Sequence, residues 1–327
     1  MSARAARILL LLAILAVVAT ASLGVGAVRL SPARIFAALG GEGSDATIVR
    51  DLRLPRVILA SLVGLALGSA GAAYQGLFRN PLADPYVIGA STGSALGATL
   101  VMIAAGDAGA FGFGAVSMGA FLGALGAAGL VYFCTAWWGP APIVTLLLAG
   151  SAVSSCLGAV VWLLMVLHDE ELARIVLWMM GSLAGRGWPA VLGSLPYVAV
   201  GFAGLCALAR PLDALCLGEQ PAQALGLPLR RMSGMIVAAA SLATAAAVAV
   251  AGVIGFVGLI APHVARAFVG ARHRYLIPAS GLAGAILMVL ADDLARTVAA
   301  PVELPVGVLT AILGGPFFLV VLRRAIR

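Results

Sequence analysis

Apolar residues in this chain are collected into long runs that alternate with short polar stretches. About 20 apolar residues in a helix, at a rise of 1.5 Å per residue, cover the roughly 30 Å hydrocarbon core of a bilayer. Ten runs approach this length, and they lie near residues 8–28, 57–78, 86–105, 111–136, 142–167, 188–209, 232–251, 254–270, 276–291 and 304–322. The pattern predicts an all-α integral membrane protein, a polytopic bundle of about ten transmembrane helices that forms one domain over residues 1–327.

The first run admits a second interpretation. Ala19-Thr20-Ala21 resembles a small-residue cleavage site, so residues 1–28 could be a signal peptide. The apolar part at 8–28 is longer than the roughly 7 to 15 residues usual in a signal core, and it is long enough to span a bilayer. We therefore favour an uncleaved first span.

One stretch has to be divided to give spans of ordinary length. Thirty-four residues without a formal charge separate Arg231 from Arg266. A single helix of that length would measure about 50 Å, which is too long for one crossing. Gly252, Gly255 and Gly258 offer a place to turn, and the stretch is predicted to form two spans.

The arginines indicate how the chain is oriented. Arg4 and Arg7 at one end and the three arginines at 323–327 at the other favour the cytoplasm, which agrees with an even number of spans. This orientation puts 12 of the 20 basic residues inside and predicts a multi-pass inner-membrane protein with both termini cytoplasmic. Three arginines within residues 50–56 then lie outside, which departs from the positive-inside rule that favours basic residues on the cytoplasmic side. A docking site for an acidic partner would explain them, and anchoring at lipid headgroups is the alternative.

Composition supports the membrane assignment and limits the function. Hydrophobic residues make up 62% of the chain, charged residues 10%, and the mean hydropathy is +1.11; a soluble domain carries about a quarter charged residues. All 20 basic residues are Arg, so the chain lacks the G-x-x-x-x-G-K-[ST] loop whose Lys contacts nucleotide phosphates. The arginines form no basic stripe, which argues against a nucleic-acid partner. We expect no cofactor to be bound by this chain.

Candidate catalytic and metal-binding residues are sparse. The four Cys occur singly, and the three His form neither H-E-x-x-H nor a triad-like spacing. The sequence therefore predicts no metal site and no enzyme activity. The carboxylates lie at span edges or in loops, whereas ion-coupled carriers usually hold one within the membrane. This distribution counts against a proton-coupled carrier.

Small residues recur every four positions in two neighbouring spans. Gly64 and Gly68 belong to the first such stripe, and Gly89, Gly93 and Gly97 to the second. Stripes of this kind let helix backbones approach closely inside a membrane. We expect close packing at these positions; the same faces could also line a pathway for a bulky substrate.

The longest polar insert on the inner side covers residues 210–231. Pro221 suits the first turn of a short helix and Gly226 its C-terminal cap, and a second short turn before Gly218 completes a compact knob. The insert also carries Leu212, Leu215, Leu217, Leu225 and Leu227. These leucines would favour packing on a partner protein, and an ordinary solvated loop is the alternative.

Four long segments resemble the FecCD family of ABC-transporter permeases, which import ferric siderophores, haem and vitamin B12. They are Leu52-Arg-Leu-Pro-Arg56; Gln75-Gly-Leu-Phe-Arg-Asn-Pro-Leu-Ala-Asp-Pro85 with Gly89-Ala-Ser-Thr-Gly93; Leu217-Gly-Glu219 with Ala224-Leu-Gly-Leu-Pro228; and Gly255-Phe-Val-Gly-Leu-Ile-Ala-Pro-His263 with Glu303-Leu-Pro-Val-Gly307. The segments follow one another in the family's order, and the resemblance covers nearly the whole chain.

This resemblance implies a type II ABC importer permease that works as a homodimer. It implies two ATP-binding subunits, which bind ATP and magnesium, and one periplasmic substrate-binding protein. The positions that match the family's ATPase-coupling helices are Leu217, Gly218, Glu219, Ala224, Leu225 and Gly226. The positions that match its docking arginines are Arg53, Arg56 and Arg296.

Two other functions compete with this interpretation. A secondary carrier would need no ATPase, and a structural or assembly subunit would leave chelate uptake unchanged when it is lost. The chelate itself stays open among siderophore, cobalamin and haem, although Trp178-Met-Met-Gly-Ser182 resembles members that carry vitamin B12.

Overall fold

The computed structural model describes residues 3–26, 30–105, 114–137 and 143–325, and within these ranges it contains helices and turns but no strand. All ten predicted apolar runs form helices, so the predicted all-α bundle is confirmed. These helices are α1 (Ala3–Ser22), α4 (Leu54–Leu77), α5 (Ala90–Ala105), α6 (Ala115–Trp137), α7 (Ile143–Leu167), α9 (Trp188–Ala207), α12 (Leu229–Ala251), α13 (Val257–Val269), α14 (His273–Thr297) and α15 (Val306–Ala325). Among the described residues, seven helices are long and apolar enough to cross a membrane, and α5, α13 and α15 contribute shorter apolar stretches.

Short helices connect the long ones. They are α2 (Pro32–Gly40), α3 (Ser44–Thr47), α8 (Leu172–Met179), α10 (Ala209–Cys216) and α11 (Glu219–Ala224), with a π-helical turn at Ile48–Arg53 and 3-10 turns at Pro85–Ile88 and Asp169–Glu171. The two short helices predicted in the polar insert are therefore present as α10 and α11. Helices α2, α3 and α8 were not predicted, because they are too short to form an apolar run of spanning length. A start signal for α2 was nevertheless present in Ser31, its N-cap, and Pro32, its first residue.

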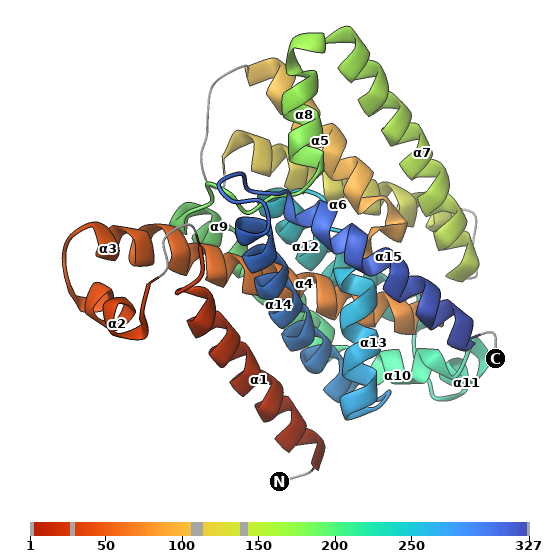
Figure 1. The fold of residues 1–327 in the computed structure, drawn as a ribbon. Coiled ribbons are helices and arrows are strands. Elements are labelled where there is room, and N and C mark those ends of the chain that lie inside the picture. The colour runs from red at the N-terminus through yellow and green to blue at the C-terminus, as the bar shows by residue number, and fades with distance from the viewer. Residues whose placement is uncertain (1–2, 27–29, 106–113, 138–142, 326–327) are drawn as a thin grey trace.

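Helix α4 forms the centre of the bundle (Figure 1). It packs against α14, α12, α13 and α9, and every residue from Gly68 to Leu77 is buried. A membrane interior offers no hydrophobic drive for helices to associate, so close backbone approach must hold such a centre together. The small residues of α4 allow that approach.

The closest pairing joins α4 to α14. A Cβ added at Gly64 would collide with the backbone carbonyl of Gly284, and one added at Gly284 would collide with that of Gly64. One turn further on, a Cβ at Gly68 would meet the carbonyl of Ser280. The two helices are thus held at backbone contact along two successive turns.

The long uncharged stretch turns where its glycines were expected to allow it. Helix α12 ends at Ala251, and Gly252 follows with φ +71°, a left-handed conformation that favours glycine. Helix α13 begins at Val257, directly after Phe256, which also has a positive φ of +67°. The stretch therefore forms two helices instead of one overlong span.

The bundle has two distinct ends. One end, called here the α10–α11 end, brings together the start of α1, the end of α4 and the start of α14 (Figure 1). Arg7 near the start of α1 donates to the carbonyl of Phe268 near the end of α13, which fixes α1 at this end. The opposite α2–α3 end carries the start of α4 and the last turn of α14.

Candidate functional site

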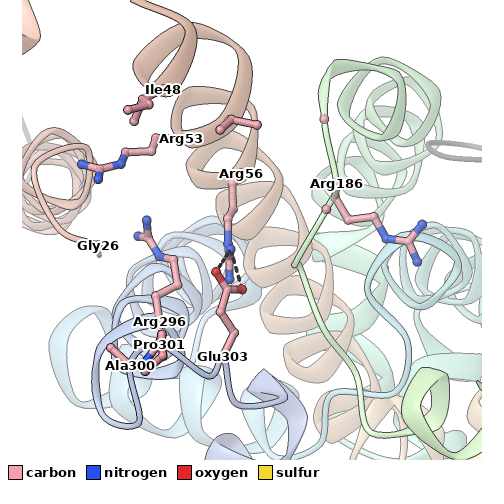
Figure 2. A pocket seen from close by; sticks show the side chains of 12 residues that line it. Gly26, Ile48, Arg53, Arg56, Arg186, Arg296, Ala300, Pro301 and Glu303 are labelled. Atoms are coloured by element: carbon pink, nitrogen blue, oxygen red, sulfur yellow. Dashed lines mark hydrogen bonds and ion pairs between the residues drawn. The ribbon is translucent and has the colours of Figure 1, made fainter. Parts of the chain in front are cut away.

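The three arginines singled out in the sequence meet at the α2–α3 end. Arg53 closes the π-helical turn, Arg56 lies in the first turn of α4, and Arg296 lies in the last turn of α14. They line one cavity of about 410 Å³ (Figure 2). Helix α14 runs to Thr297, beyond the predicted limit at 291, and this charged last turn delivers Arg296 to the cavity.

Arg56 is held by two carboxylates. Its Nε lies 2.9 Å from Oδ2 of Asp292 and its Nη1 lies 2.9 Å from Oε2 of Glu303, and Figure 2 shows Arg56 aimed at Glu303. The Arg56 side chain is 11% exposed, Asp292 2% and Glu303 41%. Of the two carboxylates, only Glu303 can therefore readily exchange Arg56 for another partner.

Arg296 belongs to the same network. Its Nε lies 3.2 Å from Oδ2 of Asp292, and its Nη2 pairs with Asp293 and donates to Ser22 Oγ at 2.9 Å. Its Nη1 donates to the carbonyl of Val25 at 3.2 Å. The last turn of α14 is in this way attached to the end of α1.

Arg53 makes a different contact from Arg56, although three residues separate them. Its Nη1 donates to the carbonyl of Leu23 at 2.7 Å, and the residue is only 7% exposed. In Figure 2 its guanidinium group lies near Gly26 and faces that of Arg296. The cluster is therefore enclosed and largely paired inside the chain.

The carboxylates of this network were not singled out in the sequence. Asp292 and Asp293 precede Arg296 by four and three residues, which is the helical spacing for an ion pair, so a signal was present. Glu303 follows α14 in a turn, and its approach to Arg56 depends on tertiary structure.

Arg186 also lines the cavity and was missed. It lies in the turn between α8 and α9, and it makes no ion pair with any residue that the structure describes. Burial lowers the pKa of its guanidinium group. In Figure 2 this group points away from Arg56.

At the α10–α11 end, the short helices are attached to the centre of the bundle. Oδ1 of Asp213 on α10 accepts from the backbone N of His273 at 2.9 Å and lies 2.7 Å from its Nδ1. Cys216 Sγ donates to the carbonyl of Gly76 at 3.3 Å. Helix α10 is therefore joined to α14 through His273 and to α4 through Gly76.

The predicted coupling residues lie around α11 and differ in exposure. Gly218 and Gly226 have positive φ angles of +117° and +77°, so both ends of α11 depend on glycine conformations. Glu219 lies in the first turn of α11 and is half-buried. The exposed members are Leu217, Ala224, Leu225 and Gly226, with Leu217 68% and Leu225 66% exposed. The leucines present apolar surface that the chain itself does not cover.

The predicted packing glycines occupy two kinds of position. A Cβ added at Gly93 or Gly97 of α5 would collide with backbone carbonyls of α6, those of Gly123 and Gly119. Gly89 differs, because its φ is +82° and the space around its Cβ position is ordinary. Its backbone conformation, which ends the turn at Pro85–Ile88, accounts for glycine there.

Nothing in the described ranges groups three or more His, Cys, Asp or Glu side chains as a metal site would require. The chemistry that the arrangement offers is charge recognition at both ends. One continuous helix pair, α4 with α14, carries the arginine cluster at one end and the α10 attachments at the other.

Comparisons with known proteins extend over nearly the whole chain. A model of the FecCD transport family matches residues 12–324. The cobalamin import system permease protein of Halobacterium salinarum is 46% identical over 276 residues, which cover 84% of this chain and 73% of that protein. The hemin transport system permease protein of Yersinia pestis is 40% identical over 322 residues, 96% of this chain and 94% of that protein.

A solved structure shows the same fold. An inward-facing conformation of a metal-chelate type ABC transporter superimposes with a TM-score of 0.86 at 33% sequence identity, covering 97% of this chain and 98% of that chain. The bundle thus has the fold of an ABC importer permease, and the predicted fold class is confirmed.

Proposed function

Because the chain belongs to the FecCD transport family, we propose that it is the transmembrane permease of an ABC importer that carries a metal chelate into the cytoplasm. The similar proteins are named for cobalamin and hemin transport, and the similar structure for a metal chelate. The proposed cargo is accordingly a ferric siderophore, a cobalamin or haem. A structural or assembly subunit is the less favoured role, because the similar proteins are named as permeases.

The observation that carries this proposal is the α4–α14 pair. It is held at backbone contact by Gly64 and Gly284, and it connects a charged site at one end to a docking surface at the other. An importer needs such a connection, since ATP is hydrolysed on the cytoplasmic side and the cargo is received from the substrate-binding protein on the opposite side.

Energy comes from a separate ATP-binding subunit in this proposal. The chain contains no Lys and therefore no Lys-bearing phosphate loop, so ATP and magnesium belong to the partner. The exposed Leu217 and Leu225 beside Glu219 form the surface on which that subunit docks. Movement of α10 would reach α14 through the Asp213–His273 contact and α4 through Cys216.

This role fixes the orientation. The α10–α11 end faces the cytoplasm of a cell's inner membrane, and the α2–α3 end faces outward. Both termini are then cytoplasmic, because α1 begins and α15 ends toward the α10–α11 end (Figure 1).

A substrate-binding protein docks at the arginine cluster of the outer end. Arg56 and Arg296 pair with three carboxylates of their own chain, so an acidic residue of the partner would compete with the exposed Glu303 for Arg56. Such an exchange keeps Arg56 paired both before and after docking. Anchoring at lipid headgroups is less favoured, because Arg53 and Arg296 are each only 7% exposed.

The permease works as a homodimer, with two ATP-binding subunits and one substrate-binding protein. Helices α7 and α15 stand on the same side of the bundle (Figure 1). Both expose large apolar side chains, among them Trp162 at 63% and Ile312 at 62%. A second copy packed against α7 and α15 would enclose a pathway between the two subunits.

Deletion and complementation test the proposal in cells. Loss of the gene should abolish growth when one class of metal chelate is the sole source of its metal. The wild-type gene should restore this growth only in cells that also contain the ATP-binding subunit. Unchanged uptake would indicate an assembly role, and uptake that persists without any ATPase would indicate a secondary carrier.

A further inference from the structure

A second charged cavity lies at the α10–α11 end. It measures about 840 Å³ and opens between the end of α4, helix α10 and the turn from α13 to α14. Four arginines line it, namely Arg79, Arg210, Arg266 and Arg272. We call this cavity the arginine pocket.

The charges of the arginine pocket are poorly balanced. Its lining contains one carboxylate, that of Asp213, and His273 already occupies it at 2.7 Å. Arg266 donates to the side-chain oxygen of Gln75 at 3.1 Å, which leaves its positive charge in place. Arg79, Arg210 and Arg272 are exposed and make no ion pair with any residue in the described ranges.

Arg79 is held at the mouth of this pocket by a defined turn. Its φ is +50°, unusual for a residue other than glycine. The turn is fixed by the bond from Asn80 N to the carbonyl of Gln75 at 3.1 Å and by that from Leu82 N to Oδ1 of Asn80 at 2.9 Å. A Cβ built on Gly218 would lie 3.7 Å from Nη1 of Arg79, so this guanidinium group lies beside the α10–α11 junction.

The position and charge of the pocket indicate its occupant. Its lining includes Leu217, one of the two exposed leucines on which the ATP-binding subunit is proposed to dock. Several guanidinium groups around one cavity suit carboxylates, which they bind through paired N–H groups. We propose that the arginine pocket receives an acidic segment of the ATP-binding subunit, an inference that rests on the proposed function.

The pocket also explains how docking would act on the bundle. The guanidinium groups come from the segment after α4, from α10, and from the end of α13 with the turn that leads to α14, so one acidic segment would contact all of these parts. Docking would then clamp α10 against the α4–α14 pair, in addition to the Asp213–His273 contact.

Charge reversal in the purified transporter tests this inference. The permease is reconstituted in nanodiscs of neutral lipid, and binding of its ATP-binding subunit is measured at several salt concentrations. Arg79→Glu and Arg272→Glu should each weaken binding by about tenfold or more, and high salt should reduce the difference from wild type. A reversal of one Asp or Glu to Arg on the ATP-binding subunit should restore part of the affinity of Arg79→Glu.

Arg274→Glu is the matched control. Arg274 is exposed two residues beyond Arg272, lies over the ring of Tyr275 at 5.9 Å from its centroid, and does not line the pocket. The permease with Arg274→Glu should bind the ATP-binding subunit as tightly as the wild-type permease does. All three variants should keep the thermal stability of the wild-type permease in the absence of the subunit, because the reversed side chains are exposed.

Three results would overturn the inference. Wild-type affinity in both pocket variants would remove the pocket from the interface while leaving the proposed function intact. An anionic-lipid stabilisation of the isolated permease that is lost in both variants, with ATPase affinity unchanged, would assign the pocket to a lipid headgroup. A wild-type permease that binds no ATP-binding subunit would remove the proposed function and this inference together.

Discussion

Arg56 and Arg296 share one carboxylate oxygen, Oδ2 of Asp292, at 2.9 Å and 3.2 Å from their Nε atoms. The two arginines come from opposite ends of the sequence and from the two helices that form the centre of the bundle. Asp292 is 2% exposed, so this shared contact fixes α4 and α14 against each other at the α2–α3 end. It makes the geometry of the arginine cluster depend on the same helix pair that is attached to α10.

The first prediction concerns the stability of this contact. Asp292→Asn leaves two enclosed guanidinium groups without their common counter-charge, and breaking a buried pair in this way removes about 3 to 5 kcal/mol. Asp45→Asn is the control, because its pair with Arg34 is exposed and an exposed pair contributes about 0 to 1 kcal/mol. Thermal unfolding in detergent should separate the two variants clearly. Equal midpoints of thermal unfolding for the two variants would show that Asp292 does not stabilise the contact between α4 and α14.

A second prediction concerns backbone approach. Gly64→Ala should destabilise the protein by about 1 to 3 kcal/mol, because the added methyl group collides with Gly284 and forces the helices apart. Gly126→Ala in α6 is the matched control, since nothing lies near its Cβ position and Ala is intrinsically the better helix former. Thermal stability should fall for the first variant and hold or rise for the second. A loss in both, or in neither, contradicts the packing argument.

A third prediction concerns the backbone conformation of Gly226 in the polar insert. Gly226 has φ +77°, which proline cannot adopt and asparagine tolerates. Gly226→Pro should abolish ATP-driven uptake while the protein still inserts, and Gly226→Asn should keep most of it. Glu219→Arg should also lose uptake. The coupling assignment fails if Gly226→Pro and Glu219→Arg both transport normally.

The fourth prediction concerns docking at the outer end. Arg56→Glu should slow association of the substrate-binding protein, and rising salt should slow it for the wild type, because salt screens the long-range attraction between the arginine cluster and an acidic partner over about 8 Å at physiological ionic strength. Glu303→Gln removes the internal competitor for Arg56 and should speed association. Arg34→Glu, at the same end but outside the cluster, serves as the control. If neither salt nor Arg56→Glu nor Glu303→Gln changes the association rate, the cluster is purely structural.

The sequence predicted the spans well because their signal is local. An apolar run of about 20 residues suffices, and even the break after Ala251 followed from its glycines. The last turn of α14 was missed because Asp292, Asp293 and Arg296 appeared too polar for a helix in the membrane. Their charges are compatible with the helix because they pair with one another and with Arg56.

The sites were less accessible to sequence reasoning, because they depend on residues that tertiary structure brings together. Spacing placed Arg53 beside Arg56, and the family resemblance added Arg296, yet neither indicated that all three would be enclosed. The arginine pocket was missed entirely, since Arg79, Arg210 and Arg272 belong to three separate connecting segments. Gly89 was grouped with the packing glycines because a four-residue stripe does not distinguish backbone approach from a left-handed turn.

Transport in proteoliposomes shows whether this permease needs an ATP-binding subunit. The permease is reconstituted with its ATP-binding subunit, its substrate-binding protein and a radiolabelled chelate, and uptake is compared with ATP, without ATP, and with an imposed proton gradient alone. We expect uptake only when ATP and the ATP-binding subunit are both present, whatever the proton gradient. Uptake by the permease alone, driven by an ion gradient, would contradict it.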